Sequence, residues 1–342
     1  MKIYVLIATA FCLSLVSCKQ DNPLIDNSSK TWNMLTVNGE NSNHLSSFEQ
    51  PTGTMIKDNL LADSLAKSPI TQVIAYGSNI YLLIPKDYKI IVLNRWNYDY
   101  EASFDFSTDK YEPTAIAFAN ATDAYVAHQN TDKLSLIDLK FYKIARTITV
   151  GNAPVAIAYS KNTIVVANSK SNSISLIDTR TYSKIADIET KEVPTFISST
   201  LATTGLVSLV CSGNGKEDSL SSSKSSAYLQ IFNPDTKQFT STTELKTTLI
   251  AGADIIPTGL VVTDKDYSFV STKSGLFLYN AKSATPLTFV KKETYKGITY
   301  NFPKEELIII RANNTAFAAK QTTGKILYEL SMPLLFGTVV AY

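Results

Sequence analysis

The sequence predicts an all-β protein built from a repeated unit of about forty residues. Segments 125–143 and 165–183 match at an offset of forty, with Val126 opposite Val166 and Ser135 opposite Ser175. Each unit contains four short runs rich in β-branched and aromatic residues, and turn residues separate these runs. Four strands in a unit of this length are typical of one blade of a β-propeller, so we predict that fold.

The strands follow one another regularly within a unit. In the best-defined unit we expect strands at 155–160, 163–168, 173–178 and 184–189. Asp178 opens the turn between the third and fourth strands, since an aspartate can accept hydrogen bonds from the backbone just after it. A proline, which cannot donate to a sheet ladder, precedes the first strand of most units. The expected unit starts are Pro69, Pro113, Pro154, Pro194, Pro257, the segment 296–298 and Pro333.

The last unit is short, and the N-terminal region supplies what it lacks. Only one strand fits into 334–342, whereas the runs 32–38, 44–49 and 53–61 provide three more. We therefore expect a seven-bladed β-propeller over 31–342, with four-stranded antiparallel blades. Its last blade is closed by one C-terminal and three N-terminal strands, which removes an exposed sheet edge. Six or eight blades are the alternatives.

The N-terminus reads as a targeting signal. Lys2 precedes a short apolar run that ends in Leu15-Val16-Ser17-Cys18, which resembles a bacterial lipobox. We expect a lipoprotein signal peptide at 1–17, lipid attachment at Cys18 and a flexible tether at 18–30. Two acyl chains would anchor the chain stably to a membrane. Residue 19 is not aspartate, which favours the outer membrane; an ordinary signal peptide and either orientation at that membrane stay open.

The composition excludes several classes of function. The net charge is +2 over 342 residues, so the chain lacks the basic excess that nucleic-acid binding requires. With His44 and His128 as its only histidines, we expect no histidine-built metal site. Cys211 lies in an apolar run, where we expect a buried and inert thiol. No motif of a phosphate loop, nucleophile elbow or metal centre occurs, so we expect no enzymatic activity and no cofactor.

The repeat resembles the YVTN family of propeller repeats. Residues 165–168 read VVAN and residues 175–178 read SLID, at the positions of that family's two motifs. The stretches 36–41 and 74–85 resemble the start of YncE-like surface lipoproteins, in which an Asn-Glu-Gly-Asn motif occurs. Here Asn38 to Asn41 read NGEN, with the middle pair transposed. This resemblance implies capture of cobalamin and its delivery to a TonB-dependent outer-membrane transporter.

Ligand-binding candidates come from one end of the strands. In a propeller, the loops between second and third strands, and between successive blades, gather over one central face. An insertion at 212–226 falls in one such loop and could act as a flap, or be a tolerated surface loop. Trp96 is expected to pack between blades, and His128 to be a satisfied strand-end residue or a ligand. The candidates are Asn38, Asn41, Tyr88, Glu112, His128, Asn168, Lys273, Tyr295, Arg311 and Asn313, with ordinary turn roles as the alternative.

These observations together predict a non-catalytic outer-membrane lipoprotein that binds a small molecule over the propeller face. The amide-rich candidate set suits a large polar ligand, such as a corrinoid or a glycan. Two other functions remain open. One is a protein–protein scaffold or adhesin at the cell surface, and the other is an envelope lactonase or hydrolase.

Overall fold

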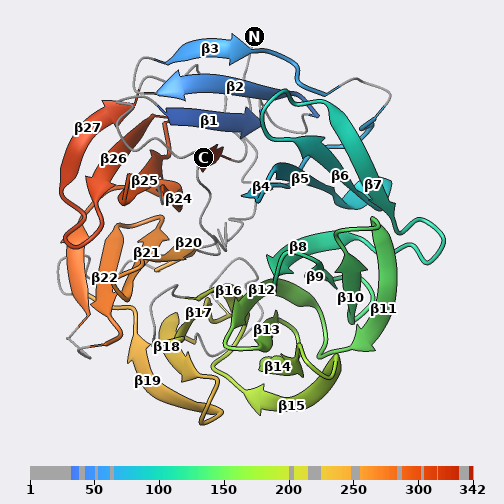
Figure 1. The fold of residues 1–342 in the computed structure, drawn as a ribbon. Coiled ribbons are helices and arrows are strands. Elements are labelled where there is room, and N and C mark those ends of the chain that lie inside the picture. Colours follow the sequence, from blue (N-terminus) through green and yellow to red (C-terminus); the bar gives the residue numbers. More distant parts are fainter. Residues whose placement is uncertain are drawn as a thin grey trace.

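The all-β fold class and the four-stranded antiparallel blades are confirmed. The computed structural model describes residues 32–37, 43–50, 53–61, 65–199, 204–214, 225–247, 255–282, 287–301, 304–313, 315–330 and 339–341. These residues form seven four-stranded sheets arranged in a ring, with a single turn of 3-10 helix, η1 (Pro85–Asp87) (Figure 1). No helix in these ranges is long and apolar enough to cross a membrane.

Six of the sheets each consist of four consecutive strands. The strands are β4 (Gln72–Tyr76), β5 (Asn79–Ile84), β6 (Lys89–Asn94) and β7 (Tyr100–Asp105); β8 (Pro113–Phe118), β9 (Asp123–His128), β10 (Lys133–Asp138) and β11 (Lys143–Thr149); β12 (Pro154–Ser160), β13 (Thr163–Asn168), β14 (Ser173–Asp178) and β15 (Ser183–Glu189); β16 (Pro194–Ser199), β17 (Val207–Cys211), β18 (Tyr228–Asn233) and β19 (Gln238–Glu244); β20 (Pro257–Val262), β21 (Tyr267–Thr272), β22 (Leu276–Asn280) and β23 (Thr288–Lys291); β24 (Tyr295–Asn301), β25 (Glu306–Arg311), β26 (Ala316–Lys320) and β27 (Ile326–Leu330).

The remaining sheet joins the two ends of the chain. Strand β28 (Val339–Ala341) pairs with β1 (Trp32–Val37), which pairs in turn with β2 (Leu45–Gln50) and, beyond it, β3 (Thr54–Lys57). Thr36 faces Val339 on one side and Ser46 on the other, both antiparallel. The ring therefore closes through one C-terminal and three N-terminal strands.

Burial decreases from the centre of the ring to its rim. Every residue of β8 is buried, and so is all of β9 after its first residue. In the outermost strand of the same sheet, β11, all residues but one are exposed. The apolar side chains of the inner strands pack between neighbouring sheets, for example Tyr81 of one sheet against Phe118 of the next, with ring centroids 4.8 Å apart. The core is thus a series of inter-sheet layers.

The start of the inner strand has a common geometry in five of the sheets. Pro113 pairs with His128, Pro154 with Asn168 and Pro194 with Cys211, in each case the last residue of the second strand. A register shift follows each of these pairs, which bends the inner strand away from its neighbour. Pro257 with Thr272, and Tyr295 with Arg311, repeat the arrangement. The first residue of an inner strand therefore lies beside the end of the second strand throughout these five sheets.

The turn after each third strand explains one sequence prediction and corrects another. Asp178 accepts a hydrogen bond from the backbone N–H of Arg180 at 2.8 Å, as predicted. Four residues after the opening Asx, the backbone enters the left-handed region, at Tyr98, Tyr142 and Tyr182. This geometry turns Tyr98 inward and leaves Trp96 outside. Trp96 is 59% exposed, so its expected packing between blades is wrong.

Candidate functional site

The predicted ligand face lies where second strands end and inner strands begin. Because each inner strand starts beside the end of its second strand, the loops at these two places share one end of every sheet. The described candidates occupy this end, on β5–β6, β8–β9, β13, β21 and β24–β25. They divide into an interior group and a group that reaches the surface.

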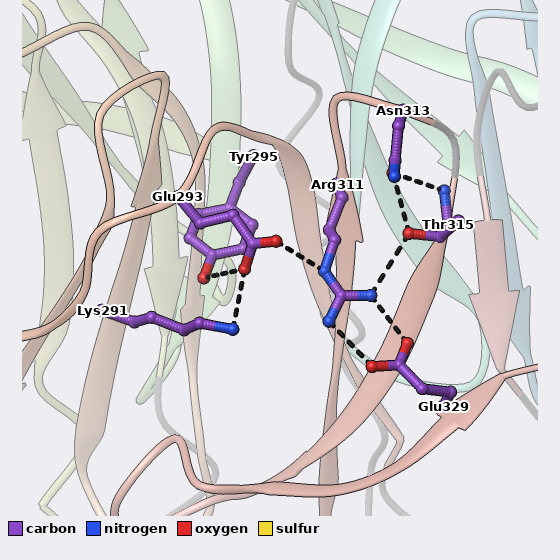
Figure 2. Close-up of polar contacts among 7 residues, drawn as sticks. All are labelled: Lys291, Glu293, Tyr295, Arg311, Asn313, Thr315 and Glu329. Atoms are coloured by element: carbon purple, nitrogen blue, oxygen red, sulfur yellow. Dashed lines mark hydrogen bonds and ion pairs between the residues drawn. The ribbon is translucent and has the colours of Figure 1, made fainter.

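Arg311, the last residue of β25, is the centre of an extensive polar cluster on this face (Figure 2). Its Nε lies 2.8 Å from Oε1 of Glu293, in the loop that leads into β24. Its two terminal nitrogens donate to the carboxylate of Glu329, at 2.7 and 2.8 Å. Oε2 of Glu293 also accepts from the hydroxyl of Tyr295, at 3.1 Å, and lies 3.0 Å from Nζ of Lys291. The guanidinium therefore links the loop before β24 to the outermost strand β27, and Glu293 extends the cluster to Tyr295 of the inner strand β24.

The cluster extends outward through the loop after β25. Arg311 Nη1 donates to Oγ1 of Thr315 at 3.2 Å. That hydroxyl donates to Oδ1 of Asn313 at 2.8 Å, and the Thr315 backbone N–H donates to the same oxygen at 3.1 Å. On its inner side the guanidinium lies over the ring of Phe317, 4.4 Å from the centroid. The arginine side chain is only 13% exposed, whereas Glu329 is 59% exposed.

Both carboxylates of the cluster are ionised at neutral pH. Burial acts to raise the pKa of Glu293, but Lys291, Tyr295 and Arg311 outweigh it and lower that pKa. Hydrogen bonds from Arg311 lower the pKa of Glu329, and the same contacts raise the pKa of the arginine. Burial and the Glu293 charge raise the pKa of Tyr295, so its phenol stays neutral. Two cations thus balance two anions, and the cluster offers hydrogen bonds rather than net charge.

Glu112 and His128 lie together at another junction of this face. The carboxylate of Glu112 is paired with Nζ of Lys86 at 2.8 Å, and its backbone N–H donates to Oδ1 of Asn130 at 3.0 Å. The ring of His128 packs on the ring of Tyr111, just before Glu112, with centroids 5.1 Å apart. Two of the predicted residues, Glu112 and His128, therefore lie close together in space. Of these, only Glu112 reaches the surface.

The side chains of His128 and Asn168 are interior packing groups. Both residues are fully buried. His128 Nε2 is 2.8 Å from Oγ of Ser135, and Asn168 Nδ2 donates to Oγ of Ser175 at 2.9 Å. Burial lowers the pKa of His128 to about 4, so the ring is neutral at pH 7. In this conformation neither side chain can contact a ligand above the face.

The other candidates are more scattered. Tyr88 has a left-handed backbone directly after η1, and its half-buried ring packs into the core between the β4–β7 and β8–β11 sheets. Lys273 is half-buried after β21, and its backbone N–H donates to the carbonyl of Ile256 at 2.9 Å. Cys18, Asn38, Asn41 and residues 215–224 of the insertion lie outside the described residues.

Sequence inspection missed four members of the Arg311 cluster, Lys291, Glu293, Thr315 and Glu329. Glu329 belongs to an outermost strand, and Lys291 and Glu293 belong to the end of the preceding unit. Only the register between strands brings Glu329 beside Phe317 and thus beside the arginine. Among the described residues, no group of three or more His, Cys, Asp or Glu side chains is placed to hold a metal ion.

Comparisons with known proteins support the fold alone. No protein-family model matches the chain, and no curated protein matches it. Among solved structures, hydrazine synthase of Kuenenia stuttgartiensis is similar with a TM-score of 0.60 and 13% identity, over 77% of this chain and 86% of that one. The WD40 domain of Neurospora crassa Pan2 is similar with a TM-score of 0.59 and 10% identity, over 86% and 84%. Both similarities show a β-propeller.

Proposed function

We propose that this chain is a non-catalytic binding protein, anchored in the outer membrane through a lipid on Cys18. Its ligand is a small molecule held over the face that carries the Arg311 cluster. The preferred ligand is cobalamin or another corrinoid, for delivery to a TonB-dependent transporter. The Arg311 cluster is the observation that carries the binding proposal, and the sequence resemblance carries the corrinoid and the transporter.

The cluster supports binding of a large, uncharged polar molecule. The largely buried side chain of Arg311 is fixed between two carboxylates. The outer groups of the cluster are therefore held in place before a ligand arrives. Such preorganisation reduces the ordering cost of binding. The exposed groups are the Glu329 carboxylate and the Asn313 amide, which together offer acceptors and a donor. The rim of a corrinoid carries amide groups that would complement them.

The titratable groups of the interior also favour binding over catalysis. His128 is neutral and fully buried, so it is poorly placed to act as a general base. Burial raises the pKa of Cys211 to about 12, so its thiol stays protonated and weakly nucleophilic. An envelope hydrolase would need other residues.

A protein scaffold is the second candidate, and exposed aromatics favour it. Trp96 is 59% exposed beneath the guanidinium of Arg95, and Phe141 is 61% exposed between Lys140 and Lys143. Exposed aromatics beside cations are common contact residues of protein interfaces. These side chains lie at the turns after third strands, at the opposite end of the sheets from the Arg311 cluster.

The ligand proposal can be tested by thermal unfolding of the full chain. Cyanocobalamin should raise the melting temperature in a concentration-dependent way, because a ligand that binds only the folded state stabilises it by mass action. Haem and a neutral oligosaccharide serve as comparison ligands. The double variant Asn313→Ala/Glu329→Gln should weaken corrinoid binding at least tenfold, whereas Lys140→Gln, at the opposite end of the sheets, should not change it.

The outcomes separate the candidate functions. If only the oligosaccharide raises the melting temperature, the binding face stays as proposed but its ligand is a glycan and not a corrinoid. No shift with any of the three compounds would overturn ligand capture and favour the scaffold. Turnover abolished by one substitution in the Arg311 cluster would instead establish an enzyme. Labelling with palmitate that is lost in Cys18→Ala would test the anchor separately.

A further inference from the structure

A tyrosine closes the junction between neighbouring sheets at the end opposite the Arg311 cluster. Tyr142 and Tyr182 occupy the left-handed position of their turns after β10 and β14. The hydroxyl of Tyr142 accepts from Nδ2 of Asn79 at 3.4 Å, and that of Tyr182 donates to Oδ2 of Asp123 at 3.3 Å. Asn79 and Asp123 are both the first residue of a second strand in the preceding sheet. The two junctions are filled in the same way.

The next junction along the chain breaks this pattern. In the β16–β19 sheet the left-handed position is held by Lys237, with φ of 56°. The equivalent residue of the preceding sheet is Thr163, the first residue of β13. Both residues line a cleft of about 640 Å³ that opens at this junction. A lysine has replaced the ring that closes the other two junctions.

The charges around the cleft leave one cation in excess. Nζ of Lys161 is 2.6 Å from the Asp235 carboxylate, and Arg180 binds both oxygens of Asp178, at 2.7 and 3.1 Å. Within the described residues, no ion pair involves Lys237. Three cations therefore face two carboxylates around one volume.

The shape of the cleft also depends on a glycine. Gly205 has φ of 62°, and a Cβ there would meet the aliphatic stem of Lys161 at 2.3 Å. The stem can lie across the Gly205 backbone only because no side chain is present. Its ammonium group is then directed to Asp235, beside Lys237. The rest of the lining consists of Asn162, Thr163, the buried residues Leu176 and Pro234, and Ile185, whose side chain is exposed.

We propose that this cleft is a binding site for a small organic anion, one that carries a carboxylate or phosphate on an apolar body. Lys237 supplies the uncompensated charge, and Arg180 offers a planar donor for a second contact. Ile185, the one exposed apolar side chain among the residues that line the cleft, contacts the apolar body of the ligand. A volume of this size falls within the range of small-molecule sites. None of the residues that line the cleft is aromatic, so it lacks a stacking surface for sugars.

Calorimetric titration of the full chain at low salt tests this site. The probes are 4-hydroxybenzoate, the uncharged 4-hydroxybenzamide and inorganic phosphate. The amide lacks the anionic head and phosphate lacks the apolar body, so the two contributions can be separated. We expect 4-hydroxybenzoate to bind at least tenfold more tightly than the amide, and its affinity to fall as salt is added. Tighter binding of phosphate than of 4-hydroxybenzoate would overturn the role of Ile185 as a contact for the apolar body.

Substitutions at Lys237 provide the decisive comparison. Lys237→Tyr introduces the residue found at the junctions of Tyr142 and Tyr182, and its ring should fill the cleft and abolish binding. Lys237→Gln removes the charge without filling the cleft, and it should weaken binding at least tenfold. Lys140→Gln, which removes one exposed cation from the corresponding turn of the β8–β11 sheet, is the matched control and should bind normally. A melting temperature of Lys237→Tyr at or above that of the wild type shows that the variant is folded.

Two results would overturn the proposal. One is the absence of binding by all three probes to the wild-type chain, and the other is unchanged affinity in Lys237→Tyr. The cleft and the Arg311 cluster lie at opposite ends of the strands and share no residue. Corrinoid binding and anion binding can therefore succeed or fail separately, since the Asn313→Ala/Glu329→Gln variant leaves the cleft intact.

Discussion

At the scale of single residues, the last position of the second strand holds residues with very different side chains. His128, Asn168, Cys211 and Arg311 all occupy it in their respective sheets. Each side chain turns toward the third strand of its own sheet and contacts a side chain there. A buried polar group requires such a partner, because it costs free energy when it is left unsatisfied. The partner therefore decides which residue the position can hold.

His128 should make the stability of the protein depend on pH. Its pKa is lowered by burial to about 4 in the folded state, against 6.5 for an ordinary histidine. The unfolded chain therefore binds a proton that the folded chain does not bind between these two pH values. The free energy of unfolding should fall as pH decreases from 6.5 to 4, by at most about 1.4 kcal/mol per pH unit.

The variant His128→Asn isolates this effect. It places the residue of the equivalent position, Asn168, in the β8–β11 sheet and removes the titrating ring. Urea unfolding of both proteins across this pH range provides the measurement, and the variant should lose less stability on acidification. The carboxylates titrate in both proteins and cancel in the difference. Parallel pH profiles would show that His128 does not titrate as described.

At the scale of elements, the turn after the third strand holds adjacent sheets together. Its Asx residue starts the turn, and the left-handed residue four positions later sends a ring into the junction. The repeat in the sequence predicted the Asx turn, because Asp138 and Asp178 recur forty residues apart. It did not predict which aromatic faces inward near Trp96, since that depends on where the backbone becomes left-handed. Tyr98 takes this position, so Trp96 is left in solvent.

Substitutions of Tyr182 should separate its packing from its hydrogen bond. Tyr182→Ala should destabilise the protein by about 1–3 kcal/mol, less than the 3–5 kcal/mol of a fully buried ring, since this ring is only half-buried. Tyr182→Phe should cost less than about 0.5 kcal/mol, because it removes only one long, partly buried hydrogen bond. Chemical denaturation measures both. Equal losses in the two variants would assign the role to the hydroxyl.

At the scale of the whole molecule, the sheet that contains both chain ends closes the ring. Strand β28 covers one side of β1, which would otherwise present an open edge. A chain that ends at residue 338 should therefore melt at a lower temperature and self-associate more readily. Deletion of residues 216–223, inside the insertion between β17 and β18, is the control, because all seven sheets keep their strands. Calorimetry and size-exclusion chromatography provide the measurements, and identical behaviour of both deletions would contradict this role of β28.

The sequence predicted this architecture better than it predicted the candidate sites. Strand positions follow from side-chain alternation and from prolines, which are local signals, so the strands predicted at 163–168 and 173–178 are found as β13 and β14. The partners of Arg311 come from three segments that only the folded register brings together. The cleft at Lys237 arises from the absence of one ring in a repeated position. Such a departure becomes visible only after the equivalent turns have been aligned in space.

The place of β1 inside its sheet also has a mechanical consequence. β1 pairs with β28 on one side and with β2 on the other, and both ladders are antiparallel. Tension applied to the chain ahead of Trp32 acts along the strand, whereas the ladder hydrogen bonds lie across it. The two ladders are then loaded in shear, so many bonds share the force instead of breaking one after another. A protein held by a tether at its N-terminus would resist being pulled open at that point.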